Sequence, residues 1–488
     1  MTTSTNPAAT IAGNLRRLAD EAPDAVAISC GADTITRAEL DRRSNRLARA
    51  YHRAGVSPES LVAIMLPNSI EFLVATIATW KAGATPLPLS AQLPARERDA
   101  ILELAAPSLV VGAPADGSVG HPSVAAGFEP DPSLSDEFVD AGAAAAWKIN
   151  TSGGSTGRPK LIVALQPALR STAEAFARLL GMTDDGAAVI TGPLYHNAPF
   201  LGSVCALTIG AHVLLMPKFD ATEALRLVDA YQADWMYVVP TMMSRISRLP
   251  AEVRDGFDVS SLNVVMHMAA PCPEWLKREW IEWLGGARLW EVYAATEAQA
   301  ITVVTGDVWL ERPGTVGTPK VGEIRILDAD RKPVSVGTVG EIWMRRAPGT
   351  PTSYRYIGAE ARTDVDGWES VGDLGWMDAD GFLFLADRES DMFTVGGANV
   401  YPAEVENALS EHPLVKSAVV VGLPHEDLGS VPHALLELEG PLTDDEVRAF
   451  LADRVARYKI PRSFERVDGP LRDDAGKVRR AQLRAARV

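Results

Sequence analysis

Short apolar segments alternate with amphipathic helical segments through the first 270 residues, and this alternation restricts the chain to few folds. The predicted strands cover residues 25–30, 61–66, 84–90, 187–192, 212–217, 234–240 and 261–270. The predicted helices cover residues 37–55, 71–83, 197–209 and 221–233, where apolar positions recur at three and four. Nearly continuous apolar strands separated by helices are typical of parallel sheets covered on both faces. The sequence therefore predicts an α/β fold.

The sequence pattern changes after about Gly314. Residues 321–346 contain shorter β segments with turn signals between them, which predict hairpins and a β subdomain. The last hundred residues mix helical and strand-like segments and predict a small α+β domain. A chain of 488 residues is long for a single core, so two or more domains are expected.

Charge and cysteine content exclude several classes of protein. The net charge of −16 argues against a nucleic acid or an anionic membrane as partner. Cys30, Cys205 and Cys272 are too few and too scattered for a disulfide framework, which favours a reducing cytoplasm. The sequence has no basic start followed by an apolar core, and no apolar run approaches 18 residues, so we expect neither export nor a membrane span.

The segment TSGGSTGRPK, from Thr151 to Lys160, combines hydroxyl side chains, three glycines and two cations. Glycine lets backbone N–H groups approach an anion closely, and the hydroxyls and cations add donors and charge, so the segment predicts a phosphate-binding loop. It is not a Walker loop, because Gly153 and Gly157 are too close together and Pro159 interrupts the pattern. Taken alone, the segment also fits a surface turn.

Further segments follow this loop in a fixed order. They are YAATEA at 293–298, VGDLGWMDADGFLFLADRESD at 371–391, GGANVYPAEVE at 396–406 and GKVRR at 476–480. Together with the loop they resemble the adenylate-forming (ANL) superfamily of acyl-CoA synthetases, carrier-protein adenylation domains and luciferases. The resemblance covers nearly the whole chain. It implies a large N-terminal domain of parallel and mixed sheets with a β subdomain, followed by a small, mobile α+β domain.

The resemblance also implies a reaction. A carboxylate is a poor acylating agent, and its conversion to an acyl-adenylate supplies AMP as a good leaving group. Such a site needs phosphate donors, a divalent cation and a positive charge near the developing charge. We therefore expect an AMP-forming acyl-CoA synthetase that uses ATP, Mg²⁺ and coenzyme A.

By resemblance, one set of residues binds the nucleotide. These residues are Thr151, Ser152, Gly153, Gly154, Ser155, Thr156, Gly157, Lys160, Ala269, Ala270, Pro271, Tyr293, Ala294, Thr296, Asp373, Arg388 and Lys477. Thr296 is expected to donate to the α-phosphate, Glu297 to hold Mg²⁺ and Asp373 to accept the ribose hydroxyls. On local sequence alone, Thr296 and Glu297 also fit a helix start, and Asp373 fits an Asx-turn.

Lys477, His196 and Thr296 are the expected catalytic residues. Lys477 is expected to reach the substrate carboxylate and the α-phosphate from the C-terminal domain, although a basic tail is also typical of a solvated surface. His196 is expected to act as a gate or polar contact beside the acyl group, although a lone histidine is often structural.

The resemblance places the domain boundary between residues 389 and 390. The resulting N-terminal domain covers 1–389 and the mobile domain covers 390–488, with a hinge at Ser390. Most relatives carry Asp or Lys at this position, so the position rather than its charge is expected to matter. Gly396 and Gly397 are expected to let the pantetheine arm of CoA pass close to the backbone.

The acyl pocket is expected to be wide and adaptable. Its predicted residues are His196, Ala198, Gly202, Met242, Met243, His267, Met268 and Ala295. Met242 and Met243 also fit a plain core. Residues 197–203 lack the acidic residue that amino-acid-activating relatives carry, which favours an apolar acid. The chain is similar to actinobacterial ligases for bulky cyclic acids of steroid or terpenoid type, including those of antibiotic pathways.

Three alternatives stay open at this point. A stand-alone enzyme that loads a carrier protein shares the pantetheine chemistry, a luciferase-like oxygenase is a weaker possibility, and a non-enzymatic ATP-binding protein is a third. The sequence leaves a monomer and a homodimer equally open.

Overall fold

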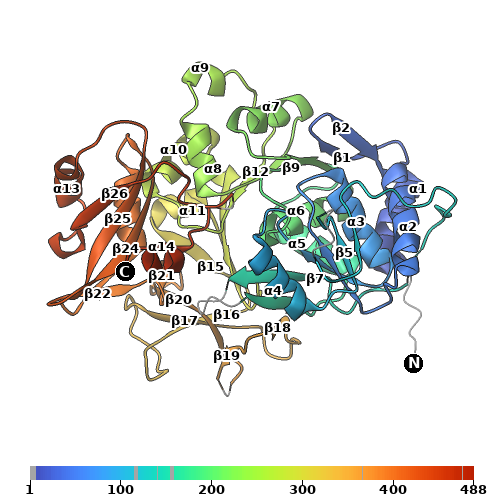
Figure 1. The fold of residues 1–488 in the computed structure, drawn as a ribbon. Coiled ribbons are helices and arrows are strands. Elements are labelled where there is room, and N and C mark those ends of the chain that lie inside the picture. The colour runs from blue at the N-terminus through green and yellow to red at the C-terminus, as the bar shows by residue number, and fades with distance from the viewer. Residues whose placement is uncertain (1–6, 115–118, 140, 154–158, 365, 475) are drawn as a thin grey trace.

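The computed structural model describes residues 7–114, 119–139, 141–153, 159–364, 366–474 and 476–488. The chain forms a large N-terminal body and a smaller C-terminal lobe beside it, seen in orange and red (Figure 1). None of the described helices has the length and apolar character needed to cross a membrane.

The largest sheet joins fourteen strands, and its parallel part runs in the order β1, β10, β9, β11, β12, β13. All four residues of β11 are buried, because helices cover both faces of the sheet. The strands are β1 (Val26–Cys30), β2 (Asp33–Thr36), β9 (Ala187–Ile190), β10 (His212–Leu215), β11 (Trp235–Val238), β12 (Val264–His267) and β13 (Leu289–Ala294). The helices around them are α5 (Arg170–Leu179), α6 (Asn197–Thr208), α7 (Ala221–Tyr231), α8 (Pro240–Ser247), α9 (Ala251–Arg254) and α10 (Glu274–Leu284).

The same sheet continues as antiparallel strands from β14 onward. The change from parallel to antiparallel strands therefore begins before Gly314, because the chain reverses after β13 and β14 runs back beside β13. This part contains α11 (Gly306–Glu311), β14 (Ile301–Thr305), β15 (Thr315–Val321), β16 (Glu323–Leu327), β17 (Gly340–Arg345), β19 (Arg362–Thr363), β20 (Glu369–Met377) and β21 (Leu383–Arg388).

Two smaller sheets complete the N-terminal body. A parallel sheet in the order β4-β3-β5-β6 contains β3 (Leu61–Ile64), β4 (Thr85–Pro88), β5 (Leu109–Val111) and β6 (Ser123–Val124). An antiparallel sheet contains β7 (Lys148–Gly153), β8 (Pro159–Ala164) and β18 (Tyr354–Ile357). Helices α3 (Ile70–Lys81) and α4 (Ala95–Ala105) pack against these sheets, and α1 (Ile11–Glu21) and α2 (Arg37–Arg53) pack beside α3.

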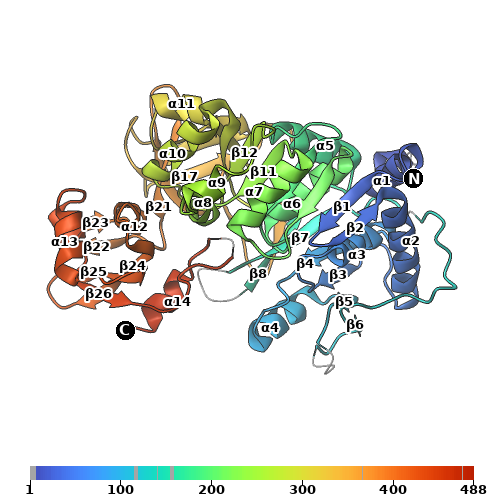
Figure 2. The same cartoon turned by 90° about the horizontal axis from the view of Figure 1, so that it is seen from above.

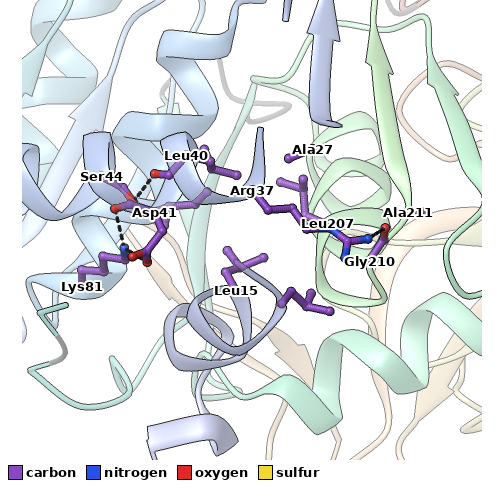
Figure 3. Close-up of a pocket in the computed structure, with 12 residues that line it drawn as sticks. Leu15, Ala27, Arg37, Leu40, Asp41, Ser44, Lys81, Leu207, Gly210 and Ala211 are labelled. Carbon is purple, nitrogen blue, oxygen red and sulfur yellow. Dashed lines mark hydrogen bonds and ion pairs between the residues drawn. The ribbon is translucent and has the colours of Figure 1, made fainter. Parts of the chain in front are cut away.

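A buried ion pair joins α2 to α3 (Figure 3). The Nζ of Lys81 lies 2.6 Å from Oδ1 of Asp41 and donates to Oδ1 of Asn45 at 2.6 Å. The small cavity beside this pair is lined mainly by aliphatic groups, and Arg37 on its other side donates to the carbonyl of Gly210. Because these charged groups bind protein atoms, we interpret the cavity as a packing feature.

The C-terminal lobe has its own sheet and its own core, which includes Val405, Val420, Leu436 and Leu451. Its strands are β22 (Phe393–Val395), β23 (Ala398–Val400), β24 (Val415–His425), β25 (Gly429–Leu438) and β26 (Ser463–Arg466). Its helices are α12 (Pro402–Ser410), α13 (Asp444–Ala452) and α14 (Arg480–Ala485). Figure 2 shows the chain before α14 leaving this lobe toward the N-terminal body. The predicted fold class, a mixed α/β body with a β subdomain and a small α+β domain, is confirmed.

Candidate active site

The site lies beyond the carboxyl ends of the parallel strands. The chain leaves β9, β11, β12 and β13 at this edge. The loops after β9, β12 and β13 carry His196, Ala269 and Thr296, and Thr241 lies in the first turn of α8, which follows β11. Parallel strands end at a common edge, so residues up to a hundred positions apart meet there. Ala269 has a φ of 76°, in the left-handed region that alanine adopts rarely, which marks a tightly constrained turn.

A cavity with about 680 Å³ of empty space, part of it open to solvent, lies behind Thr296 and Glu297. Its wall includes the predicted Ala198, Met268 and Ala295. Ala294, expected at the nucleotide, also lies in this wall. Most of the remaining wall is apolar: Trp147, Ala164, Phe176, Leu179, Leu180, Leu201, Met266, Val292, Ala298 and Ile301.

Five predicted pocket residues lie outside this wall, and packing explains their positions. Met242 and Met243 belong to the main core, where Thr191 Oγ1 donates to the Met242 sulfur at 3.2 Å. Gly202 faces Trp235, since a Cβ added to it would lie 3.3 Å from that ring. The other two are His267 and His196. His267 is fully buried on β12, and burial lowers its pKa to about 4.

His196 is the residue before α6, and its Nε2 is buried without a hydrogen-bond partner among the described residues. Burial lowers the pKa of His196 to about 3, and the ammonium of Lys477 adds to this effect. The imidazole is therefore neutral at physiological pH. A neutral ring can accept or donate a hydrogen bond but supplies no positive charge.

Glu297 is the central carboxylate of the site and is only 6% exposed. It accepts a hydrogen bond from the hydroxyl of Tyr356 at 2.5 Å, and the Nζ of Lys160 lies 3.6 Å from the same oxygen. The Lys160 ammonium also lies 4.1 Å from the centre of the Tyr356 ring. Lys160 is thereby held beside the carboxylate from the far end of the predicted phosphate loop.

Asp373 and Arg388 face each other on β20 and β21, with Arg388 Nε 3.3 Å from Asp373 Oδ1. The interpretation of Asp373 as a turn residue is therefore wrong, because the chain continues through it as an extended strand. Tyr293 donates its hydroxyl to Asp373 Oδ2 at 2.8 Å. The structure thus joins three of the predicted nucleotide residues in one network.

Lys477 comes to this site from the C-terminal lobe. Gly476, with a φ of 75°, packs against Thr241, where an added Cβ would lie 3.2 Å from the threonine hydroxyl. The Lys477 backbone N–H donates to Asp473 at 2.8 Å. Part of Lys477 stays in contact with solvent, yet desolvation by the surrounding groups lowers its pKa. The positive charge of Arg388 also lowers this pKa, whereas the carboxylates of Asp473 and Glu297 raise it.

Polar contacts hold the lobe in this position. Arg479 Nη1 lies 3.0 Å from Glu97 of α4, and Arg248 Nη1 lies 2.9 Å from Glu439. The indole of Trp275 donates to the Ser410 hydroxyl at 3.2 Å. Lys477 is therefore presented by a docked lobe rather than by a free tail.

The remaining predicted residues come from several segments. Thr151, Ser152 and Gly153 end β7, whereas Gly154, Ser155, Thr156 and Gly157 lie outside the described residues. Ala270 and Pro271 follow Ala269 in the loop after β12. Gly396 and Gly397 form the two-residue turn between β22 and β23, with φ of 57° and 85°, so the turn itself requires glycine there.

Sequence reasoning missed Tyr356 and Lys148. Tyr356 contacts Glu297 from a strand about sixty residues away, and no local pattern marks it. Lys148 is one of ten lysines and stands in the otherwise apolar run AAAAWKI, which was a usable signal. It lies in the wall of the cavity.

The chain is similar to known proteins over nearly its whole length. The family model for AMP-binding enzymes matches residues 15–354, and that for the AMP-binding enzyme C-terminal domain matches residues 404–477. A feruloyl-CoA synthase of Amycolatopsis is 32% identical, over 96% of this chain and 97% of its own length. A Rhodococcus jostii CoA ligase for a methyl-dioxo-octahydroindenyl propanoate is 30% identical, over 96% of this chain and 97% of its own length.

A solved structure of the Bacillus subtilis o-succinylbenzoate CoA synthetase, in complex with its acyl-adenylate intermediate, has the same fold. Its TM-score is 0.84 at 26% identity, over 96% of this chain and 97% of that one. The chain therefore belongs to the AMP-binding enzymes, the adenylate-forming superfamily. Within that family it is an AMP-forming acid–CoA ligase, whose substrates are ATP, a carboxylic acid and CoA.

The neutral state of His196 predicts a pH dependence of stability. Its pKa is depressed from an unfolded value of about 6.5 to about 3, so the unfolded chain takes up a proton first as the pH falls. The stability contributed by the neutral ring is complete above pH 6.5 and is lost between pH 6.5 and 3. Urea titrations should show that wild type loses about 1.5 kcal/mol more than His196→Gln between pH 6.5 and 5.

The exposed His52 supplies the control, and the free energy of unfolding of His52→Gln should change with pH as it does in wild type. Parallel pH dependences of wild type and His196→Gln would show that the ring is not held neutral by its surroundings.

Proposed function

We propose that this ligase activates a bulky, mainly apolar cyclic carboxylic acid, of terpenoid or steroid type in size, and transfers the acyl group to CoA. The observation that carries this proposal is the cavity behind Thr296 and Glu297, whose wall is mostly apolar and aromatic. Burial of apolar surface in such a cavity stabilises a large ring system by about 25 cal/mol per Å².

The relatives and the sequence both support a cyclic acid. The two curated ligases named above act on a feruloyl group and on an octahydroindenyl propanoate. Residues 197–203, NAPFLGS, offer no carboxylate for an α-ammonium group, which disfavours amino acids.

In the first half-reaction, cations and hydrogen-bond donors neutralise the anions that must meet. Lys477 and Thr296 are proposed to bind the oxygens of the substrate carboxylate and the α-phosphate. Lys160 and the segment from Thr151 are proposed to hold the β- and γ-phosphates. A pre-positioned donor in a site of low polarity acts most strongly where charge develops, so these groups lower the barrier to attack of the carboxylate on the α-phosphorus.

Glu297 is proposed to hold Mg²⁺. Among the described residues no cluster of three metal-ligating side chains occurs, which fits an ion that binds one or two carboxylates and completes its shell with water and substrate phosphates. When bound, Mg²⁺ would neutralise phosphate charge. Tyr356 orients the Glu297 carboxylate through its hydrogen bond, and Lys160 would exchange that carboxylate for phosphate.

The second half-reaction needs Lys477 to leave. We propose that the lobe, residues 390–488, rotates about Ser390 and brings the Gly396-Gly397 turn toward the site for CoA. Ser390 is exposed in the turn between β21 and β22. Its φ is not in the left-handed region, and its N–H bonds to no acceptor among the described residues. Rotation there would break two turn hydrogen bonds that span it, from the N–H groups of Asp391 and Met392 to the carbonyl of Arg388.

A panel of acids tests this function. Acid-dependent pyrophosphate release should be strongest with bicyclic and tricyclic carboxylic acids, weaker with single-ring acids and absent with amino acids, and CoA should convert the product to AMP and thioester. Equal rates with short linear acids would contradict a wide apolar cavity. Activity confined to amino acids would overturn the proposal.

Glu297→Gln tests the metal role while keeping the shape of the side chain. Loss of the charge should weaken apparent Mg–ATP affinity by about tenfold or more, and high magnesium should restore part of the rate. The matched control is Glu282→Gln, at an exposed position on α10, which should leave the magnesium titration unchanged. An unaltered magnesium dependence in Glu297→Gln would place the ion elsewhere.

A further inference from the structure

Lys148 is a buried lysine in the wall of the acyl cavity. It begins β7, is 4% exposed, and its Nζ lies 4.9 Å from the centre of the Trp147 ring. Lysine is almost never fully buried unless a partner compensates its charge. The surroundings of this ammonium therefore need an explanation.

The partners of Lys148 are neutral. Its Nζ donates to Asn150 Oδ1 at 2.6 Å and to Asn197 Oδ1, and both acceptors are amide oxygens. No carboxylate lies within ion-pair distance of it among the described residues, and its third N–H has no acceptor there. Burial accordingly lowers the pKa of Lys148 to about 7, because the two amides only partly replace water around the charge.

Of the two charged side chains in the described wall of the cavity, Lys148 is the one available to a ligand. Glu297 is the other charged side chain in the described wall, and Tyr356 and Lys160 already engage it. Asn150 and Asn197 fix two N–H groups of Lys148, which orients the ammonium without neutralising it. A rigidly held donor surrounded by aromatic and aliphatic side chains discriminates strongly between ligands that do and do not satisfy it.

We propose that Lys148 is a specificity-determining residue that binds a second anionic oxygen on the acid, separate from the carboxylate that is activated. The inference rests on the proposed function and narrows its substrate class to a cyclic acid with a remote carboxylate or acidic hydroxyl. The carboxylate that reacts must meet the α-phosphate beside Thr296 and Lys477. Lys148 would bind the part of the acid that lies away from the reacting carboxylate.

Matched acids test the assignment in the intact enzyme. The probes are 3-phenylpropanoate, its ortho-, meta- and para-carboxyl derivatives, and the methyl esters of those ring carboxyls as neutral counterparts. Wild type should have a kcat/KM about 10- to 100-fold higher for at least one dicarboxylate than for its ester, the size typical of a buried charge-assisted hydrogen bond. The ester controls for size and for ring substitution.

Lys148→Met supplies the second arm, because methionine keeps the length and removes the charge. It should abolish the preference for the dicarboxylate, while kcat/KM for 3-phenylpropanoate changes by less than about threefold. Lys218→Met makes the same chemical change at an exposed position and should keep the wild-type preference.

The outcomes separate this inference from the function on which it rests. If wild type has the same kcat/KM for the monocarboxylate, the esters and the dicarboxylates, the proposed role of Lys148 is wrong and the ligase assignment is unaffected. An equal loss for every acid in Lys148→Met would assign the lysine to the fold or to the reacting carboxylate, and would also overturn it. Wild type that activates no cyclic acid would contradict the proposed function itself.

Discussion

The common edge of the parallel strands is the constraint on which the rest of the molecule depends. The loops that follow β9, β11, β12 and β13 converge there, so the order of strands in the sheet, rather than closeness in sequence, brings His196, Ala269 and Thr296 together. The antiparallel strands extend the same sheet and bring Asp373 within a hydrogen bond of Tyr293. An acid and a nucleotide can therefore be held by one rigid surface.

The charged side chains at this edge come from two parts of the molecule. Glu297 and Asp373 are held by hydroxyl groups and cations of the N-terminal body, whereas Lys477 comes from another lobe. The contacts Arg479–Glu97 and Arg248–Glu439 are largely exposed ion pairs, and such pairs contribute about 0–1 kcal/mol each. Weak lobe contacts beside a rigid site support the proposal that Lys477 is delivered for one step and withdrawn for the next.

The sequence predicted the fold class and the family well, because strand and helix periodicity and the ordered motifs are local signals. It predicted less of the acyl cavity. Met242 and Met243 follow β11 just as pocket residues would, but their side chains turn into the main core, which only tertiary packing decides. The turn that VGDLG suggests by composition does not form at Asp373, because pairing with β21 holds this residue extended. Tyr356 reaches Glu297 through the pairing of β18 with β8, a long-range contact without a local signature.

The central claim is that Lys477 serves one half-reaction from a lobe that must then move. Separate measurement of adenylate formation and of thioester formation from supplied acyl-adenylate tests it in Lys477→Ala and Ser390→Pro. Lys477→Ala should lose about 10²- to 10³-fold in adenylation and keep thioester formation. Ser390→Pro, which fixes φ near −65°, should keep adenylation and lose thioester formation. Equal losses in both half-reactions for both variants would contradict the account.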